Sequence, residues 1–429
     1  MRVPAVYFLA VFLAATCYRA TAQGAQQLTL HEAEQIAIQN HPQIQSASNL
    51  ASAAKEQVTA QRSAYYPTVV GNVTAADAEN NSRISAGLLN SPLVFDKEAQ
   101  GLAINQLVTD FGRTHELVKS SKLHFQSQQE NVVNTRAEVL LDVDRAYYGA
   151  LRAQAELNVA QETVKDRQLV SNQTTELEKN QIKSGLDVSF ANVDLAQAQL
   201  LLIQAQNDVQ TSYAILSSAL GYGDTRTFDL SEEPTPSSPP ADFSALLQEA
   251  IQNRPDLLTL KLDAQSAHTY ATAERDLWFP TISALGVAGV APVRADQLPP
   301  RYAAAGVNVN IPLFNGHLFG ALRGEANYRA KAQDENTRNL QDQIVRDVRT
   351  AWLNANSGYQ RLAVATQLLK SATDALDLAQ SRYKLGLSSI IELSQAQLNL
   401  TQAQLYSSNA KYDYQTQLSV LNFQIGALH

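Results

Sequence analysis

The residues that could carry out catalysis or bind a metal are scattered along this chain. The seven histidines lack the spacing of metal ligands, and no glycine-rich phosphate loop is present. No serine, nor the single cysteine Cys17, stands in the setting of a catalytic nucleophile. We therefore predict that the protein is not an enzyme and that it uses no cofactor and no metal.

Polar residues gather instead around two glycine-containing turns, Lys183-Ser184-Gly185-Leu186 and Lys384-Leu385-Gly386-Leu387. Each glycine suits the left-handed position that follows the end of a helix. Asp187 stands where an N-cap is expected, and Ser389 to Glu392 has the spacing of a capping box. On this pattern alone both turns join the ends of long helices.

A long helix that occurs twice must position these turns. Between residues 139 and 164 the apolar residues follow steps of four and three, which keeps them on one narrow seam of a supercoiled helix. The seam returns 205 residues later, and Asp142-Val143-x-x-Ala146-Tyr147 matches Asp347-Val348-x-x-Ala351-Trp352. No proline interrupts residues 113–183, so this helix spans about 100 Å.

The remaining pattern is duplicated as well. The pattern of each half predicts an amphipathic helix, two strands, the long helix and a return helix such as the one at residues 187–220. The expected strands cover residues 68–76, 101–109, 281–290 and 302–311, and residues 77–100 read as an exposed loop. We expect a first repeat at 23–230, a proline-rich linker at 231–242 and a second repeat at 243–429.

The N-terminus is typical of an exported protein. An apolar run ends at Ala20-Thr21-Ala22, which predicts a signal peptide at residues 1–22. Cys17 permits a lipoprotein interpretation, which Thr16 and Ala14 disfavour. Without Arg2 and Arg19, 31 basic residues face 41 acidic ones. Such an acidic chain is a poor partner for nucleic acid.

Four strands per chain cannot close into a barrel, and open sheet edges are not tolerated against lipid. No later stretch reaches the roughly 18 apolar residues of a membrane-spanning helix, so a membrane contact must use strands and several copies of the chain. Two copies would give eight strands and three would give twelve. Aromatic residues flank the expected strands, as in an interfacial girdle or in the cap of a soluble β-layer: Tyr65, Tyr66, Phe111, Trp278, Phe279, Phe314 and Phe319.

The order of these motifs resembles the TolC-like outer-membrane efflux proteins over nearly the whole mature chain. The resemblance rests on Leu28-Thr29-Leu30, Asn40-His41-Pro42, Tyr66-Pro67 and the turns at Gly185 and Gly386. It implies a mainly α fold with a small β part: a homotrimer with a twelve-stranded outer-membrane barrel and a periplasmic α-barrel. It further implies a periplasmic adaptor and an inner-membrane transporter as partners.

The resemblance also assigns residues. The two glycine turns, Lys183 to Leu186 and Lys384 to Leu387, correspond to the tips that meet the adaptor. Glu392 and Gln395 correspond to the family's acidic constriction, although Gln395 lacks the charge. Ala191 and Ser388 lack the groups that latch some relatives shut. The gate candidates are therefore Glu392, Gln395, Asp187, Asp194 and Tyr383.

The sequence is compatible with two functions. The first is an export conduit in the outer membrane, extending into the periplasm, for drugs, metals, peptides or polysaccharide-related cargo. The second is an exported coiled-coil rod without a pore, whose strands form a soluble cap.

Overall fold

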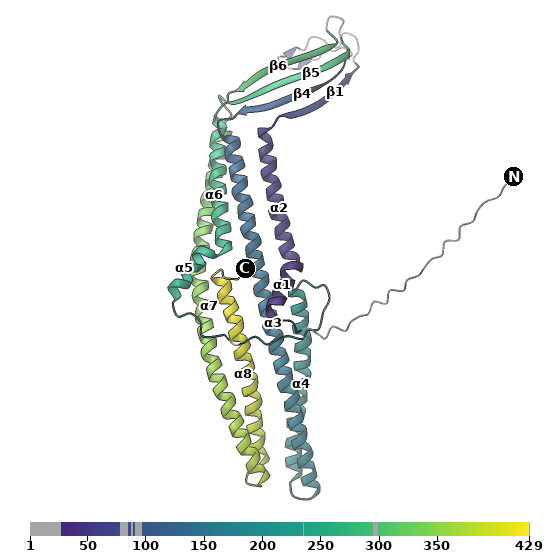
Figure 1. Ribbon diagram of the computed structural model, residues 1–429, viewed down its shortest axis with the longest axis vertical. Helices are drawn as coiled ribbons and strands as arrows, with labels where there is room; N and C mark the ends of the chain where they lie inside the picture. The colour runs from purple at the N-terminus through teal and green to yellow at the C-terminus, as the bar shows by residue number, and fades with distance from the viewer. Residues whose placement is uncertain are drawn as a thin grey trace, which may run out of the picture.

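The protein is a long rod that carries a small sheet at one end (Figure 1). The computed structural model describes residues 27–77, 85–86, 89–90, 97–234, 236–294 and 299–428. The expected signal peptide, with Cys17, lies outside the described residues, as does most of the loop expected between strands one and two. Helices support the sheet, and helical hairpins form the opposite end of the rod.

The two halves have helices of equal length. Each half contains helices of 11, 21, 67 and 35 residues in that order. In the first half they are α1 (Leu30–Asn40), α2 (Pro42–Arg62), α3 (Arg113–Lys179) and α4 (Gly185–Ala219). In the second they are α5 (Phe243–Asn253), α6 (Pro255–Arg275), α7 (Leu318–Lys384) and α8 (Ile390–Gln424). Short 3-10 turns, η1 (Ser63–Tyr65) and η2 (Asp276–Trp278), lead from helix to strand.

One four-stranded antiparallel sheet contains strands from both halves. Its order is β1 (Thr68–Ala76), β4 (Lys97–Thr109), β5 (Thr281–Val293) and β6 (Arg301–Asn310). Each half supplies a hairpin, and the central ladder between β4 and β5 joins the halves, with Gly101 opposite Gly289. A separate two-stranded ribbon pairs β2 (Ser85–Ala86) with β3 (Leu89–Asn90).

The strands lie where they were expected, but two of them are longer. The first occupies residues 68–76 as predicted, whereas β4 begins at Lys97 rather than Gly101 and β5 continues to Val293. Residues 97–100 are polar except for Ala99 and show no apolar alternation, yet Ala76 pairs with Lys97 in the ladder. Backbone pairing therefore extends the strand beyond its side-chain pattern.

The alanine-rich seam forms the core at mid-height of the rod. Val143 and Ala150 in the first half, and Val348 and Ala355 in the second, are fully buried. The two matched aromatic residues, Tyr147 and Trp352, make equivalent hydrogen bonds in the two halves. Tyr147 donates its hydroxyl to the carbonyl oxygens of Leu28 and Ser231, and Trp352 donates its indole N–H to that of Pro240. The duplicated motif thus holds the connecting segment between the halves against both long helices.

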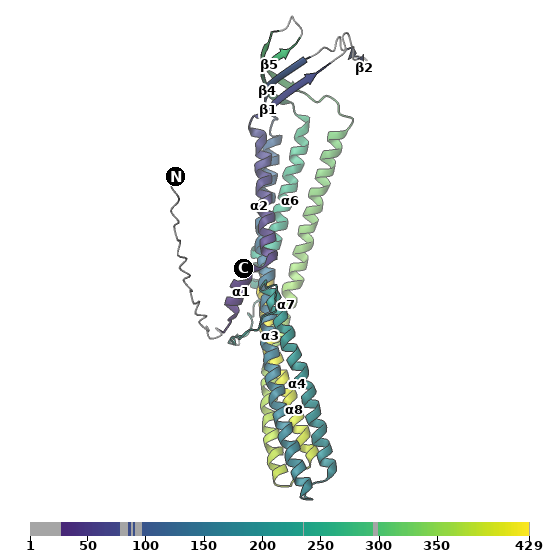
Figure 2. The same cartoon turned by 90° about the vertical axis from the view of Figure 1, so that its right-hand side faces the viewer.

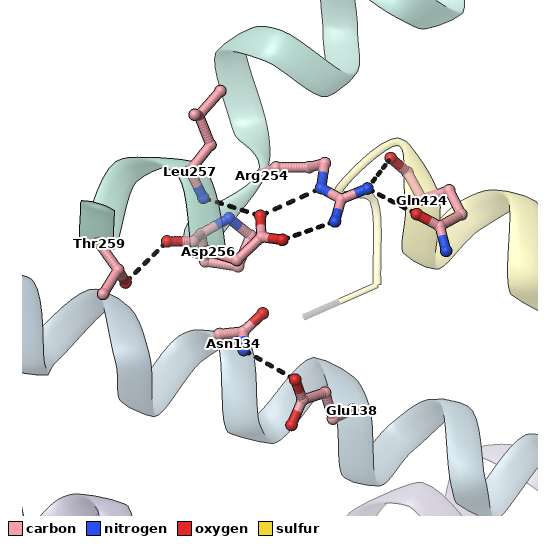
Figure 3. Close-up of polar contacts among 8 residues, drawn as sticks. Asn134, Glu138, Arg254, Asp256, Leu257, Thr259 and Gln424 are labelled. Carbon is pink, nitrogen blue, oxygen red and sulfur yellow. Dashed lines mark hydrogen bonds and ion pairs between the residues drawn. The ribbon is translucent and has the colours of Figure 1, made fainter. Parts of the chain in front are cut away.

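The end of each return helix packs on a helix junction of its own half. Gly426 (φ 75°), just beyond α8, contacts the backbone at Asn253, and Gly221 (φ 80°), beyond α4, contacts Asn40. At the second junction the buried Arg254 pairs with Asp256 at 2.6 Å and donates to Gln424 Oε1 at 2.5 Å (Figure 3). These contacts anchor α8 halfway up the rod.

Among the described residues, α4 is the one helix long and apolar enough to cross a membrane by length and composition, with a mean hydropathy of 1.2. The expectation that no later stretch would qualify was wrong, because leucine, valine and isoleucine side chains make an 18-residue window of this helix apolar although they are interspersed with polar residues. The helix pairs with α3 at the end of the rod farthest from the sheet (Figure 1). Only 11% of that window is buried, so an apolar surface of α4 is uncovered in the single chain.

Candidate functional site

The first hairpin tip differs from its prediction in how the turn is made. Gly185 does not end the long helix: α3 ends at Lys179, and the left-handed residue beyond it is Gln181 (φ 61°). Gly185 is instead the first residue of α4, whose N-cap is Ser184. Asp187 is not that N-cap. It occupies the third helical position and completes a capping box with Ser184.

The second tip follows the prediction more closely. Gly386 has a φ of 73° directly after the last residues of α7, the left-handed conformation that favours glycine. Leu385 and Leu387 are 73% and 66% exposed, as is Leu186 at 65% on the first tip. Both tips therefore present leucine side chains to solvent in the single chain.

Glu392 takes part in the N-cap of α8 through its backbone and in an ion pair through its side chain. Its backbone N–H donates to Ser389 Oγ at 3.3 Å, so Ser389 caps α8. Its carboxylate pairs with Arg382 Nε at 3.1 Å across the turn, and both side chains are about half exposed. Gln395, one turn along, is exposed and donates to Asn399. The tip thus places an arginine beside the one carboxylate that the resemblance assigned to a constriction.

Tyr383 joins the two tips. The Lys183 ammonium of the first hairpin lies 4.5 Å from the centre of the Tyr383 ring on the second, within the range of a cation–π contact. The Tyr383 hydroxyl is buried and has no hydrogen-bond partner among the described residues.

Above the tips, a buried polar cluster connects three helices. We call it the clasp: Arg167 on α3, Asp194 on α4, and Ser394 and Gln397 on α8. Arg167 Nη1 lies 3.3 Å from Asp194 Oδ2 and also donates to Gln397 Oε1, while Ser394 donates its hydroxyl to Asp194. The Arg167 side chain is only 7% exposed. The clasp therefore holds the first hairpin to the second through a desolvated charge.

Burial shapes the electrostatics of the clasp. It lowers the pKa of the Arg167 guanidinium below its usual value, and the Asp194 carboxylate opposes that change by favouring the charged form. Removing the Asp194 carboxylate would leave the buried positive charge without its ion-pair partner, with only the weaker influence of Asp166 to favour it, which is unfavourable.

Of the clasp residues, the sequence predicted only Asp194 as functional. A signal for Arg167 was present, because the four-and-three spacing that ends at Val164 continues to positions 167, 171 and 174. All three of these positions are buried although they hold Arg167, Ser171 and Thr174. A seam that turns polar while staying buried marks the place where the hairpins are joined by hydrogen bonds.

A second buried charge lies at mid-height. Asp144 on α3 is 2% exposed, and burial raises the pKa of its carboxyl to about 7. The neighbouring Glu34 on α1 raises it further, whereas a hydrogen bond with Ser419 on α8 lowers it. Asp144 thus stands where α1, α3 and α8 meet. Within the described residues, no group of three or more His, Cys, Asp or Glu could hold a metal ion.

The sheet has two chemically different faces. The register places on one face a set of apolar side chains that includes Val69, Val73, Leu102, Ile104, Ile282, Val307 and Val309, together with Gln100 and Gln106. The opposite face carries Asn72, Thr74, Asn105, Ser283, Asn308 and Asn310 along with a few apolar residues. Val73 and Val307 are 76% and 70% exposed, so the apolar face is uncovered.

The predicted aromatics lie at the boundary between the sheet and the helices. Two aromatic pairs are in contact there. Phe111 of the first half is 6.2 Å from Phe279 of the second half, and Trp278 of η2 is 5.7 Å from Phe319 of α7, measured between ring centres. Six of the seven are exposed, with Phe314 at 82%, and Phe319 is half-buried. An exposed aromatic ring at one end of an apolar sheet face is typical of a membrane interface.

Comparisons with known proteins agree with this geometry. A family model described as outer membrane efflux protein matches residues 34–222 and 246–427. The outer membrane protein TolC of Vibrio cholerae is 26% identical over 402 residues, which cover 91% of this chain and 89% of that protein.

Solved structures are similar over the same length. A crystal structure of a membrane protein from Pseudomonas aeruginosa has a TM-score of 0.81 at 20% identity, covering 92% of this chain and 90% of the other. The open-state structure of the MtrE outer membrane channel from Neisseria gonorrhoeae has a TM-score of 0.78 at 19% identity, covering 93% and 89%.

Proposed function

This chain belongs to the outer membrane efflux protein family, and we propose that three copies of it close into one conduit through the outer membrane and the periplasm. The chain is an outer-membrane channel for efflux or type I secretion. The observation that carries the proposal is the four-stranded sheet with one uncovered apolar face and two open edges, standing on helices of about 100 Å.

The sheet edges support closure by identical copies. β1 and β6 are the outer strands, and every neighbouring pair is antiparallel. Because the sheet has an even number of alternating strands, β6 of one copy can pair with β1 of the next in the antiparallel sense that barrels use. Three copies give twelve strands, with the apolar face toward lipid and the polar face toward the lumen.

The uncovered helices support the same closure. The exposed apolar residues of α4, among them Phe190, Leu200 and Ile203 at 41%, 68% and 63%, lie on a helix that pairs with α3 and makes few contacts elsewhere. A neighbouring copy would cover this surface, since monomers rarely leave so much apolar area in water. In the proposed trimer the hairpins of three chains form the wall of the helical tunnel.

The gate and the partners are assigned on this basis. The tips, with Leu186, Leu385 and Leu387 exposed, are proposed to meet a periplasmic adaptor that joins the channel to an inner-membrane transporter. The clasp is proposed to hold the hairpins of each chain together in the resting state. Glu392 is proposed to line the inner end, where its pairing with Arg382 weakens the attraction for cations.

Single-channel recording tests the conduit directly. Protein extracted in detergent and shown to be folded and oligomeric is added to a planar bilayer, and we expect discrete openings. A matched pair of single cysteines locates the lumen, since Cys17 precedes the expected cleavage site and the mature chain has no other cysteine. A charged thiol reagent should reduce conductance for Asn308→Cys on the polar face and leave Val307→Cys unchanged.

The rod without a pore makes the opposite prediction. In that case folded, oligomeric protein gives no openings, is released from membranes by a carbonate wash, and reacts with thiol reagents equally at positions 307 and 308. Either of the first two results would overturn the conduit.

A further inference from the structure

A pocket with a basic lining lies directly below the sheet, between the end of α2 and the start of α3. Its volume is about 530 Å³, and it is lined by Arg62, Tyr65, Tyr66, His115, Val118, Lys119 and Lys122. No acidic residue is part of that lining. We propose that this basic pocket binds the phosphate-bearing headgroup of an anionic phospholipid in the periplasmic leaflet, an inference that rests on the proposed placement of the strands in the membrane.

The charges of the pocket point to an anion. Within the described part of the chain, Arg62 and Lys122 make no ion pair, and Lys119 has only a long contact with Glu116 at 3.8 Å. Like charges gathered in one concave site repel each other, and an anion that enters removes this cost. Lysine and arginine are the side chains that most often bind phosphate groups in proteins.

The pocket lies at the level of the lipid headgroups. Tyr65 and Tyr66 immediately precede β1, and Lys122 lies about 14 Å along the axis of α3 from its first residue, Arg113. Side chains on a helix lean toward its N-terminus, and α3 begins at the sheet. Lys119 and Lys122 therefore point back toward the membrane, while tyrosine is a side chain enriched at membrane interfaces.

The pocket opens on the outer side of the helical wall. α3 packs between α2 and α6, and its residues at spacings of four and three form stripes along its surface. His115, Lys119 and Lys122 belong to the exposed stripe, whereas Leu117 and Ser121, on the opposite side, are half-buried. Gln106, whose register position is on the apolar face of the sheet, donates to the Tyr65 carbonyl oxygen, so this wall of the pocket lies on the side that we propose faces lipid.

Native mass spectrometry of the whole detergent-purified protein tests the site. The probes are phosphatidylglycerol, zwitterionic phosphatidylcholine and inorganic phosphate. A lysine near an anionic surface strengthens binding about fivefold, so the double variant Lys119→Ala with Lys122→Ala should weaken phosphatidylglycerol binding about thirtyfold. The control, Lys331→Ala, removes a lysine of α7 that lies beside Tyr328 but lines no described pocket. It should change binding by less than twofold.

Each other outcome overturns the inference. Equal losses in the double variant and the control would mean that no specific pocket exists. Inorganic phosphate that competes fully would make the site one for free anions rather than lipid. A shift of ion selectivity toward cations in the double variant would place the pocket in the lumen. Failure of the conduit itself is distinguishable, because the wild-type protein would then leave carbonate-washed membranes.

Discussion

Replacing Arg167 with methionine tests the clasp, because methionine has a similar length but no charge and no donor. In the single chain the guanidinium bonds Asp194 and Gln397 while only 7% of its side chain is exposed. A hydrogen bond to a charged group contributes about 1.5 to 3 kcal/mol. If the clasp opens with the channel, even about 1.4 kcal/mol per chain, taken over three chains that open together, raises the open-to-closed ratio about a thousandfold.

Single-channel open probability in a planar bilayer measures this shift. The matched control is Arg152→Met, because Arg152 also joins α3 to α8 by pairing with Asp413, at 3.4 Å, but both side chains are 44% exposed. A surface pair of this kind contributes about 0 to 1 kcal/mol, so the control should open like the wild type.

A loss of folding is separable from a loss of gating. The second variant, Arg167→Met with Asp194→Leu, replaces the whole ion pair with apolar groups, which buried sites often tolerate without loss of stability. It should melt like the wild type, by circular dichroism, and still open freely. Folded, trimeric protein carrying either variant whose open probability equals that of the wild type would refute the clasp as a lock.

Three further predictions use other parts of the rod. The buried Asp144 carboxyl has a raised pKa, so the stability that it contributes is fully present below its ordinary pKa of 3.8 and is lost as the pH rises toward 7. Asp144→Asn should therefore abolish a fall of about 4 kcal/mol between pH 4 and 8 in the unfolding free energy measured with denaturant. Arg382→Gln should increase cation selectivity in reversal-potential measurements, and Glu392→Gln should lower it; identical selectivity in both would exclude this pair from the pore. Gly386→Ala, at a φ of 73°, should cost about 1 to 2 kcal/mol in the same denaturation assay, whereas Gly185→Ala, at a helix start, should cost nothing.

The repeated seams and turns made the fold predictable from local pattern. Spacing alone located both long helices, the strand at residues 68–76 and the left-handed Gly386, because each depends on neighbours within a few positions. Gly185 was misassigned, since the long helix ends at Lys179, Gln181 takes the left-handed conformation, and the glycine begins the next helix.

The clasp was harder to predict because its members lie far apart in the chain. Arg167 meets Asp194 and Gln397 only after both hairpins have formed and packed. In a polar stretch of helix an arginine is usually solvated, and only the continued seam spacing indicated otherwise. The basic pocket was missed for the same reason, since Arg62 and Lys122 come from different helices.

The central ladder of the sheet has a consequence for how the channel is made. β4 and β5 pair directly, with Thr109 facing Ile282, so the middle of the sheet contains one strand from each half. A lone hairpin of two strands is at best marginally stable in water. The first half of a newly exported chain therefore has only its own β1–β4 hairpin until the second half has crossed the inner membrane. During that interval the chain is most exposed to aggregation and to periplasmic proteases, and the four-stranded sheet can be completed only after β6, which ends at Asn310, has been exported.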